Sequence, residues 1–589
     1  MKRFLLIYLV FCCFYSMGKK NNKRPNVIIV ITDDQGKNDL GCEGNSYIQT
    51  PNLDRFYDNA IRLDNFHVST TCAPSRGALM TGRHTNRLNV FHTIGGRSLL
   101  FEDEITMGQV FASNGYTTGM FGKWHLGDNY PFRPEDRGFQ EVVRHGGGGI
   151  SQAPDYWGND YFDDTYYHNG KQQQYKGYCT DVFFEEAINF IDDNKDEPFL
   201  CYLSTNAPHG PRNCPIEYID KYKDQPKLED KFKRFYGMIS NIDDNFKRLI
   251  DYLEENNLRE NTILIFMTDN GTAGGNKVYS AGMKGAKGSQ YEGGHRVPFY
   301  IQWPQGKLKG GQDIENLTAH YDVLPTLMEM CDVKYNFSKK IDGKSFRTLL
   351  YDSSATWSNR ILYVDKQRES NLVKNKDYAV MDNRWRLVNG NELYDINEDL
   401  GQKINLYDKY PEVVGRLNEG YNRWWQSLES EGVDRRFAYI KVGTRFENPT
   451  ALSAHDLLSP RKIGTYDQTH CVSCKPGSGI FKVSFEKSGR YRITLSRFPI
   501  ESDLRINQTF PKKVQEKRIE KKWQASTKSD FEFAKLDFAQ YHMKKKITSQ
   551  DKLIYFELDV TKGNYDLSSV FEDKNRVIYP AYYTYIEKL

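Results

Sequence analysis

The sequence has almost no surplus of charge of either sign, because 81 basic side chains stand against 77 acidic ones and leave a net charge of +4. This balance gives no reason to expect a nucleic acid as partner. No apolar run reaches the roughly 20 residues that a membrane-spanning helix needs, and the chain contains no internal repeat or low-complexity segment. With 39% hydrophobic and 27% charged residues, the 589 residues are expected to form about three globular domains.

Residues 1–18 are predicted to be a signal peptide and not part of the fold. Basic residues precede an apolar stretch at 4–15, and small residues follow where a signal peptidase cleaves. A lipoprotein signal, with the lipid on Cys12 or Cys13, is the alternative, although Phe11 stands where a small residue is expected. Either signal predicts export. We expect the periplasm, with secretion or surface anchoring as alternatives.

Cysteine is scarce outside the leader, and the eight that remain form no disulfide framework. Export would still allow a few of them to pair. Cys471 and Cys474 form a CxxC pair, but there is no second CxxC and no βαβ pattern nearby, and His470 precedes the pair where a haem site needs a histidine after it. We therefore interpret the pair as a local disulfide or as two idle thiols.

Two continuous apolar runs, residues 26–32 and 262–268, predict strands that are covered on both faces of a sheet. Between residues 232 and 253, apolar side chains recur at helical spacing, so a helix leads into the second strand. A helix that feeds a buried strand is typical of a parallel α/β sheet. The sequence therefore predicts an α/β domain over residues 25–365.

Polar side chains follow both predicted strands where each strand ends: Asp33 and Asp34 after the first, Asp269 and Asn270 after the second. Ligands bind beyond the carboxyl ends of parallel strands, so we expect these side chains to meet there. Three carboxylates at one place would repel one another, and a divalent cation that prefers oxygen ligands would hold them together. The alternative is that each pair caps a following turn or helix.

The pattern changes twice after the first domain. Residues 366–434 combine short predicted strands between residues 378 and 395 with a helix that begins at Pro411, which indicates a small α+β subdomain. Residues 435–589 contain short alternating strands and are predicted to be an appended all-β domain, a sandwich. The basic stretch at 512–522 is interpreted as a solvated loop, with docking of an anionic polymer as the alternative.

The most specific feature is the string CAPSR at residues 72–76, followed by TGR at 81–83. Pro74 suits the first turn of a helix and Gly82 its end, so Cys72 is predicted to lie at a helix N-terminus, which favours an anion. A lone cysteine there would suggest a reactive thiolate. The full string resembles instead the signature of type I sulfatases of the alkaline phosphatase-like superfamily, in which this cysteine is oxidised to Cα-formylglycine.

The resemblance extends over roughly residues 25–430 and is closest in kind to bacterial polysaccharide sulfatases. It implies an alkaline phosphatase-like sandwich around a mixed, mostly parallel central sheet. It also implies a formylglycine-generating or sulfatase-maturing enzyme as partner of residue 72. The hydrate of formylglycine carries two hydroxyl groups: one attacks sulfur, and the other later expels the sulfate, which neither a serine nor a cysteine could do.

The resemblance also implies a metal site. Asp33, Asp34, Asp269 and Asn270 match the metal ligands of the family, and residue 72 adds an oxygen ligand after modification of Cys72. One Ca²⁺ ion is expected, with Mg²⁺ as the alternative, because an oxygen-only shell suits both. The cation would polarise a sulfate oxygen and help to deprotonate the attacking hydroxyl.

Three further motifs match the family: GKWHLG at 122–127, APHGP at 207–211, and KGAKG at 284–288 with YEGGHRVP at 291–298. The first should be a strand end or loop. The resemblance implies that Lys123 holds sulfate, that His125 takes the proton that triggers sulfate release, and that His209 protonates the departing sugar oxygen. Lys287 is expected to bind the sulfate and the leaving oxygen, and Arg76 to brace residue 72.

The segment from residue 144 to 181 is predicted to recognise the sugar, because it is rich in glycine, aromatic and hydrogen-bonding side chains. The candidate substrate-binding residues are His145, Trp157, Asn159 and His168. The alternative is a packed aromatic insert.

The predicted activity is hydrolysis of sulfate esters on carbohydrate by a sulfuric ester hydrolase. Algal polysaccharides of the ulvan, fucoidan or carrageenan type and their oligosaccharides lead as substrates, with glycosaminoglycans behind them. Phosphoester or phosphonate hydrolases share the expected fold and are the nearest alternative, but they use serine or threonine, or two metals. A non-catalytic carbohydrate-binding relative is a further alternative, and the filled catalytic positions argue against it.

Overall fold

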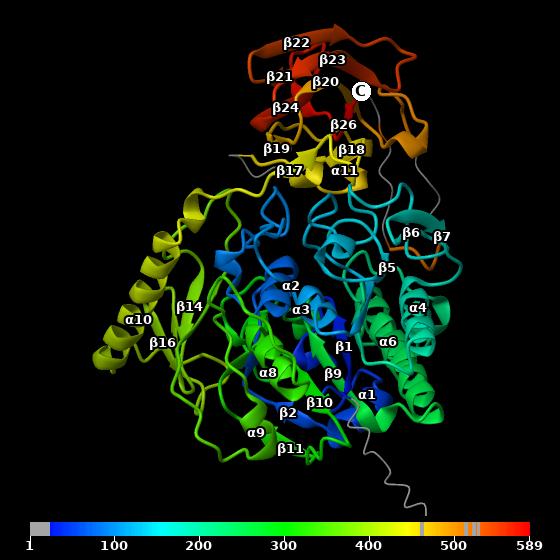
Figure 1. The fold of residues 1–589 in the computed structure, drawn as a ribbon. Coiled ribbons are helices and arrows are strands. Elements are labelled where there is room, and N and C mark those ends of the chain that lie inside the picture. Colours follow the sequence, from blue (N-terminus) through cyan, green and yellow to red (C-terminus); the bar gives the residue numbers. More distant parts are fainter. Residues whose placement is uncertain (1–23, 460–464, 512–515, 521–525, 527–529) are drawn as a thin grey trace, which may run out of the picture.

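The computed structural model in Figure 1 describes residues 24–589, apart from residues 460–464, 512–515, 521–525 and 527–529. The predicted signal peptide and parts of the basic stretch at 512–522 lie outside the described residues. Within these limits, no helix is both long and apolar enough to cross a membrane.

In the part of the chain that the structure describes, ten strands form the central sheet. Its middle strands β9, β1, β8, β4 and β5 are parallel, and antiparallel neighbours join them on both sides, which confirms the predicted α/β class with a mixed sheet. In order across the sheet, the strands are β11 (Gln312–Ile314), β2 (Ile61–Leu63), β10 (Phe299–Gln302), β9 (Thr262–Thr268), β1 (Asn26–Thr32), β8 (Phe199–Ser204), β4 (Thr117–Gly122), β5 (Glu141–Arg144), β6 (Thr165–His168) and β7 (Lys171–Gln174).

Helices cover both faces of this sheet because successive strand side chains point into two different apolar cores. Val27, Ile29 and Ile31 of β1 pack into one core, and Ile28 and Val30 into the other. The first core is closed by α2 (Cys72–Thr81), α3 (Met107–Ala112), α8 (Val323–Met330) and α9 (Arg347–Tyr351), and the second by α1 (Pro51–Asp58), α4 (Cys179–Asp193) and α6 (Asp230–Glu255) (Figure 1). The helix predicted at 232–253 is α6.

A four-stranded antiparallel sheet and one long helix form the small subdomain within the described residues. Its strands are β13 (Leu362–Asp365), β14 (Tyr378–Met381), β15 (Trp385–Val388) and β16 (Glu392–Asp395), and its helix is α10 (Pro411–Ser430). The short strand predicted at 378–388 is therefore a hairpin of two strands. Because β13 pairs with β14, the sheet begins a few residues before the expected boundary at residue 365.

The C-terminal region folds into two β-sheets that share one apolar core, as the predicted sandwich requires. Leu99, Phe101 and Phe132 of the first domain join this core, so the β domain is packed onto the first domain (Figure 1). Among the described residues, one sheet contains β17 (Ile440–Val442), β19 (Phe481–Phe485), β24 (Gly563–Asp573), β21 (Phe531–Phe538), β22 (Tyr541–Lys546) and β25 (Ile578–Pro580), and the other β18 (Thr450–Ser453), β26 (Tyr583–Lys588), β20 (Gly489–Ser496) and β23 (Ile554–Val560).

Cys471 and Cys474 lie at the end of α11 (Gln468–Val472) in this domain. Every cysteine in the described residues is a free thiol. Cys471 is buried and directs its sulfur to the Asp467 carbonyl at 3.8 Å, whereas the Cys474 sulfur lies 3.9 Å from the Val472 carbonyl. Of the two interpretations from the sequence, the structure shows two separate thiols.

Candidate active site

The polar side chains after β1 and β9 meet at one edge of the central sheet. The two strands are parallel and in register, with Thr32 opposite Thr268, so the residues that follow are brought side by side. The backbone N–H of Asp34 donates to Asp269 Oδ1 at 3.1 Å, and Asn270 Nδ2 donates to Asp34 Oδ1 at 3.0 Å. All four predicted side chains are buried here. The register of a parallel pair thus assembles them as expected.

Cys72 lies beside these carboxylates, at the first residue of α2. The helix ends at Gly82, whose left-handed backbone (φ 66°) is the conformation that a helix-terminating glycine supplies. Ligand atoms of Asp33, Cys72 and Asp269 all lie within 4.8 Å of one another. Burial raises the pKa of the Cys72 thiol, although Lys123 and Lys287 act against it. An unmodified Cys72 is therefore held as a thiol, not as a reactive thiolate.

The residues of this cluster fit a hard divalent cation. Asp33 Oδ1 and Asn270 Oδ1 are buried, and among the described residues neither has a hydrogen-bond partner. Burial, with the neighbouring Asp33, raises the pKa of Asp269 to about 6, although Arg76 lowers it. Buried carboxylates with unused oxygen atoms are the donors that Ca²⁺ and Mg²⁺ bind.

Three cations already surround the carboxylates. Arg76 has no exposed side-chain surface and donates two hydrogen bonds to Asp269 Oδ2, at 2.7 and 3.1 Å. Its third nitrogen donates to the Lys123 carbonyl at 3.2 Å and to Ser204 Oγ. Lys123 Nζ contacts Asp33, and Lys287 Nζ contacts Asp34. Cationic groups that face a cluster with a nucleophile position can bind an anion such as sulfate.

The Lys123 motif follows β4, in agreement with the predicted strand end. Gly122 has a left-handed backbone (φ 103°), and a Cβ atom there would lie 1.9 Å from the Ser204 carbonyl oxygen, so only glycine fits. Lys123 N–H donates to that same carbonyl at 2.8 Å. His125 also has a positive φ of 63°, so the segment turns and is not extended.

His125 is buried, and its hydrogen bond fixes its tautomer. The Nε2 atom lies 2.9 Å from the carbonyl oxygen of Thr93, which can only accept, so Nε2 carries the hydrogen. Nδ1 is then an acceptor, and it has no partner among the described residues. Burial, followed by the charge of Lys123, lowers the pKa of His125 well below its usual value. A neutral imidazole with a free lone pair is a general base.

His209 lies on the loop after β8. Its Nδ1 donates to the Gly210 carbonyl at 2.7 Å, and its Nε2 lies 3.9 Å from Asp34 Oδ2. The pKa of His209 is lowered to about 3, chiefly by burial; Asp34 raises it, and Lys287 adds to the lowering. Burial would raise the pKa of Asp34, but Lys287 and then His209 hold it below its usual range.

The glycine-rich turn at residues 146–149 lies against both histidines. A Cβ atom on Gly148 would be 2.3 Å from the His125 ring, and one on Gly149 would be 3.3 Å from His209 Nδ1. Side chains at these two positions would push the histidines aside. The absence of side chains at Gly148 and Gly149 therefore leaves room for the rings of His125 and His209.

Three of the four candidate substrate-binding residues are held by contacts within the protein, whereas His145 keeps a buried Nε2 atom without a partner among the described residues. His145 is buried and donates to the Gly146 carbonyl at 2.9 Å, and Asn159 Nδ2 donates to Asp155 and to the Thr165 carbonyl at 2.8 Å. His168 on β6 contacts Glu141 at 2.6 Å. The ring of Trp157 packs edge-on against Phe498 of the β domain, with centroids 5.3 Å apart. For Asn159, His168 and Trp157 these contacts favour the alternative of a packed insert.

Ser204 is a site residue that the sequence analysis missed. It ends β8, next to β1 and β4, and its hydroxyl donates to the Lys123 carbonyl at 2.8 Å. The signal was present: residues 199–203 are an apolar run that ends in polar residues, as in β1 and β9.

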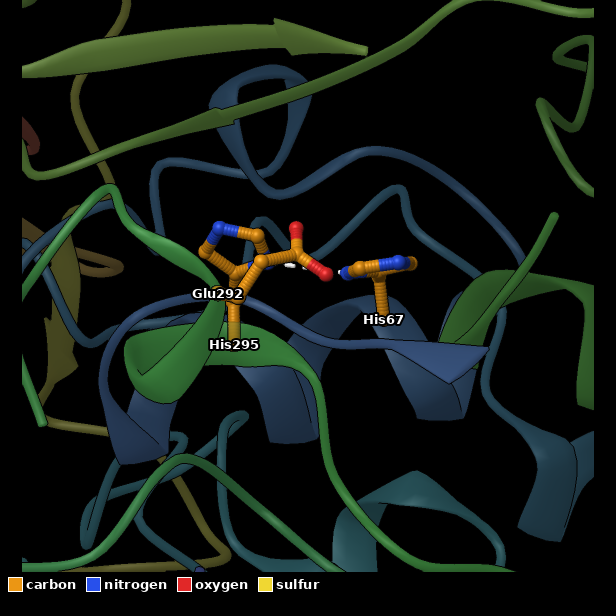
Figure 2. A group of neighbouring side chains, drawn as sticks. All are labelled: His67, Glu292 and His295. Carbon is orange, nitrogen blue, oxygen red and sulfur yellow. Dashed lines mark hydrogen bonds between the residues drawn. The ribbon is translucent and has the colours of Figure 1, made fainter. Parts of the chain in front are cut away.

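A second buried group, shown in Figure 2, has the composition of a metal site but is filled by hydrogen bonds. It consists of His67 on β3 (Phe66–His67) with Glu292 and His295 of α7 (Glu292–His295). His67 and His295 share a hydrogen bond between their Nδ1 atoms at 2.9 Å. Glu292 accepts from Arg386 of β15 at 2.6 Å and from Arg296 at 3.3 Å. The Glu292 carboxylate is thus paired with two guanidinium groups. Because Arg386 belongs to the subdomain, this cluster joins the subdomain to α7, which follows the segment with Lys287.

Two family profiles match the chain. The one described as Sulfatase matches residues 25–333, and the one described as N-sulphoglucosamine sulphohydrolase, C-terminal matches residues 286–424.

Individual relatives are similar over most of the chain. An uncharacterised sulfatase of Escherichia coli is 27% identical over 515 residues, which cover 71% of this chain and 89% of that protein. An N-acetylglucosamine-6-O-sulfatase of Bacteroides thetaiotaomicron is 24% identical and covers 66% and 84%. The crystal structure of Ps i-CgsB, also solved in complex with k-i-k-neocarrahexaose, has a TM-score of 0.62 and 27% identity and covers 68% of this chain and 93% of that one.

Proposed function

Because this chain belongs to the sulfatase family and is a sulfuric ester hydrolase that acts on carbohydrates, we propose that its substrates are sulfated oligosaccharides of algal polysaccharides. The observation that carries the assignment of the site is the group of Asp33 after β1, Asp269 after β9 and Cys72 at the start of α2, whose ligand atoms lie within 4.8 Å of one another.

The nucleophile in this proposal is made from Cys72. A maturation enzyme oxidises the cysteine to formylglycine, whose hydrate would supply an oxygen nucleophile where the buried thiol now lies. Asp33, Asp34, Asp269 and Asn270 would hold one Ca²⁺ or Mg²⁺ ion, which supplies Lewis-acid polarisation of a sulfate oxygen when it is bound. The oxygen atoms without partners on Asp33 and Asn270 support this ligand set.

The surrounding side chains take the remaining roles. Lys123 and Lys287 bind the sulfate oxygens as point charges. His125 takes a proton at Nδ1, because its Nε2 hydrogen is committed to the Thr93 carbonyl. His209 would deliver a proton to the departing sugar oxygen from Nε2, after this nitrogen has taken up a proton, since its Nδ1 hydrogen is committed to Gly210. Arg76 holds Asp269 and the Lys123 backbone in place.

Carrageenan-type oligosaccharides are the leading substrates within this class. The similarity at 27% identity to a structure solved with k-i-k-neocarrahexaose supports this choice. Ulvan and fucoidan oligosaccharides come next, and glycosaminoglycans are the second candidate because the Bacteroides relative is named for N-acetylglucosamine. We further propose that the protein is exported to the periplasm, on the basis of its N-terminal sequence.

Sulfate release measured by ion chromatography tests the proposal. The protein is produced with a maturation enzyme, and the conversion of residue 72 is verified by the mass of its peptide. We expect release from carrageenan oligosaccharides, measured beside ulvan, fucoidan and glycosaminoglycan oligosaccharides and 4-nitrophenyl sulfate. Turnover of 4-nitrophenyl sulfate with no release from any glycan would contradict the proposed substrate class. An unmodified cysteine in active protein would contradict the proposed nucleophile.

A further inference from the structure

The appended β domain reaches the active site through a short 3₁₀ turn, η8 (Ala454–Asp456). The loop at residues 93–97 lies between this turn and His125. It accepts the His125 hydrogen bond at the Thr93 carbonyl, at 2.9 Å, and Gly95 N–H donates to the His455 carbonyl at 2.7 Å. The His455 and His125 rings are consequently neighbours, with centroids 6.0 Å apart.

His455 is held in one orientation by the residue that follows it. Its Nδ1 lies 3.1 Å from Asp456 Oδ1. A carboxylate only accepts, so Nδ1 carries a hydrogen, and in the tautomer with this single hydrogen Nε2 is an acceptor. That Nε2 atom is buried and has no partner among the described residues. A buried acceptor without a hydrogen bond costs about 1–3 kcal/mol, so a donor at this place would be favourable.

Two neighbouring imidazole rings, whose centroids are 6.0 Å apart, therefore each keep a buried nitrogen without a partner in the described part of the protein: Nδ1 of His125 and Nε2 of His455. Lone pairs of neutral imidazoles do not attract a sulfate oxygen, whereas a hydroxyl group can donate to either. His455 is as deeply buried as the catalytic residues. Its side chain is 2% exposed, like that of Cys72, and His125 is 5% exposed. The chemistry that suits the position is a sugar hydroxyl.

A cavity that begins at the neighbour of His455 also suits a carbohydrate, although the two histidines themselves do not line it. Asp456 lines a cavity of about 310 Å³ between the first domain and the β domain, together with Asp128, Tyr167, Glu501 and Tyr585. Its lining mixes carboxylates and tyrosines, which can receive sugar hydroxyls and pack against sugar rings. Its volume is at the lower end of the range of ligand pockets, about 300–1,000 Å³.

The β domain touches the other side of the site as well. Glu520 accepts from the Arg212 backbone N–H at 2.6 Å, and the Arg518 carbonyl accepts from Cys214 N–H at 3.1 Å. These contacts hold the loop that begins at His209. The β domain therefore contacts the loop that binds His125 and the loop that carries His209.

We propose that His455, oriented by Asp456, is a substrate-binding residue that the appended β domain contributes to the active site, where its Nε2 accepts a hydrogen bond from a hydroxyl group of the sulfated sugar. This inference rests on the proposed function for its substrate class. It goes beyond the two family matches, which end at residues 333 and 424.

The test compares two substrates on the same variants. In His455→Ala, kcat/KM for carrageenan oligosaccharides should fall about 3- to 10-fold, the effect of one lost hydrogen bond, while kcat/KM for 4-nitrophenyl sulfate, which has no hydroxyl, should stay unchanged. His455→Gln, whose amide oxygen can accept near the position of Nε2, should recover part of the loss. His542→Gln is the matched control, because His542 forms the same kind of pair with Asp537, at 2.9 Å, on the exposed surface of the same domain.

Equal losses on both substrates would overturn the proposal, because they would show that His455 only positions His125 or the fold. Unchanged activity on both substrates would overturn it too. Thermal midpoints and the formylglycine content of residue 72 identify any variant that is misfolded or unmodified, and His455→Gln then carries the test. Failure of the proposed function appears in the unaltered enzyme, as absence of glycan turnover, whereas failure of this inference appears only in the variants.

Discussion

The buried pair of Glu292 and Arg386 should be one of the most sensitive points of the fold. Glu292 is fully buried and Arg386 is 1% exposed, with 2.6 Å between Oε1 and Nε, and the pair links the small subdomain to α7. In Glu292→Gln the shape is kept, but Arg386 remains as a buried cation without its counterion. Breaking a buried pair in this way costs about 3–5 kcal/mol.

That free energy corresponds to a fall of about 5–10 °C in the thermal midpoint for a domain of this size. The pH dependence has a definite sign. Burial raises the pKa of Glu292, but Arg386 and then His67 and Arg296 lower it below its usual range. Its stabilising effect is therefore complete above the ordinary glutamate pKa of about 4.3, and it is lost as the pH falls below that value. The difference between the two proteins should shrink in the same window.

Scanning calorimetry of the unaltered protein, Glu292→Gln and Arg386→Met, with the double variant, measures the coupling. The double variant should lose less than the sum of the single ones, because it leaves no unpaired charge. Glu419→Gln is the control, since its pair with Arg423 on α10 is largely exposed and its loss should leave the midpoint unchanged. A Glu292→Gln midpoint equal to that of the control would refute the reasoning. A midpoint that rises with added Zn²⁺ would show that His67, Glu292 and His295 bind a metal.

Two further predictions concern the active site and the insert. Chelation should abolish sulfate release, and added Ca²⁺ or Mg²⁺ should restore it. The Asp269→Ala variant should lose both the bound metal and the activity. Full activity in a sample shown by elemental analysis to be metal-free would contradict the metal site. Trp157→Ala should lower the thermal midpoint and reduce turnover of glycan and of 4-nitrophenyl sulfate to the same extent, because the ring packs against Phe498; a loss confined to glycan would instead indicate that Trp157 stacks on sugar.

The assembly of the catalytic cluster could be predicted because few physical rules decide it. Apolar runs placed β1 and β9 in a sheet interior, and parallel strands in register must bring the residues after their ends together. The helix signals around Cys72 are local, so Pro74 and Gly82 were enough to place it at the start of α2. The motif with Lys123 was placed correctly at a strand end, but its turn was not foreseen, because a positive φ at His125 depends on the packing of its neighbours.

The link between the subdomain and the first domain could not be predicted. Arg386 lies in a stretch that the sequence indicates only as a short strand, and nothing in that pattern says that its side chain enters the first domain to meet Glu292. His67 carries no sequence signal at all. Contacts of this kind depend on the docking of separately folded elements, which local periodicity does not encode.

Substrate recognition escaped the sequence for a different reason. The candidates His145, Trp157, Asn159 and His168 were chosen for their chemical type. Trp157, Asn159 and His168 each have a protein partner that uses their polar atoms or ring, whereas the buried Nε2 atom of His145 has no partner among the described residues. A residue can bind a ligand only where a polar atom is left without such a partner, and this is a property of the packed structure. By that criterion His168, bound to Glu141 and Tyr175, is a poor candidate, whereas His145 and His455 each keep a ring nitrogen without a partner among the described residues. The reaction determines which residue types catalysis needs, so motifs can reveal them. The residues that select the sugar depend instead on which domain packs against the site.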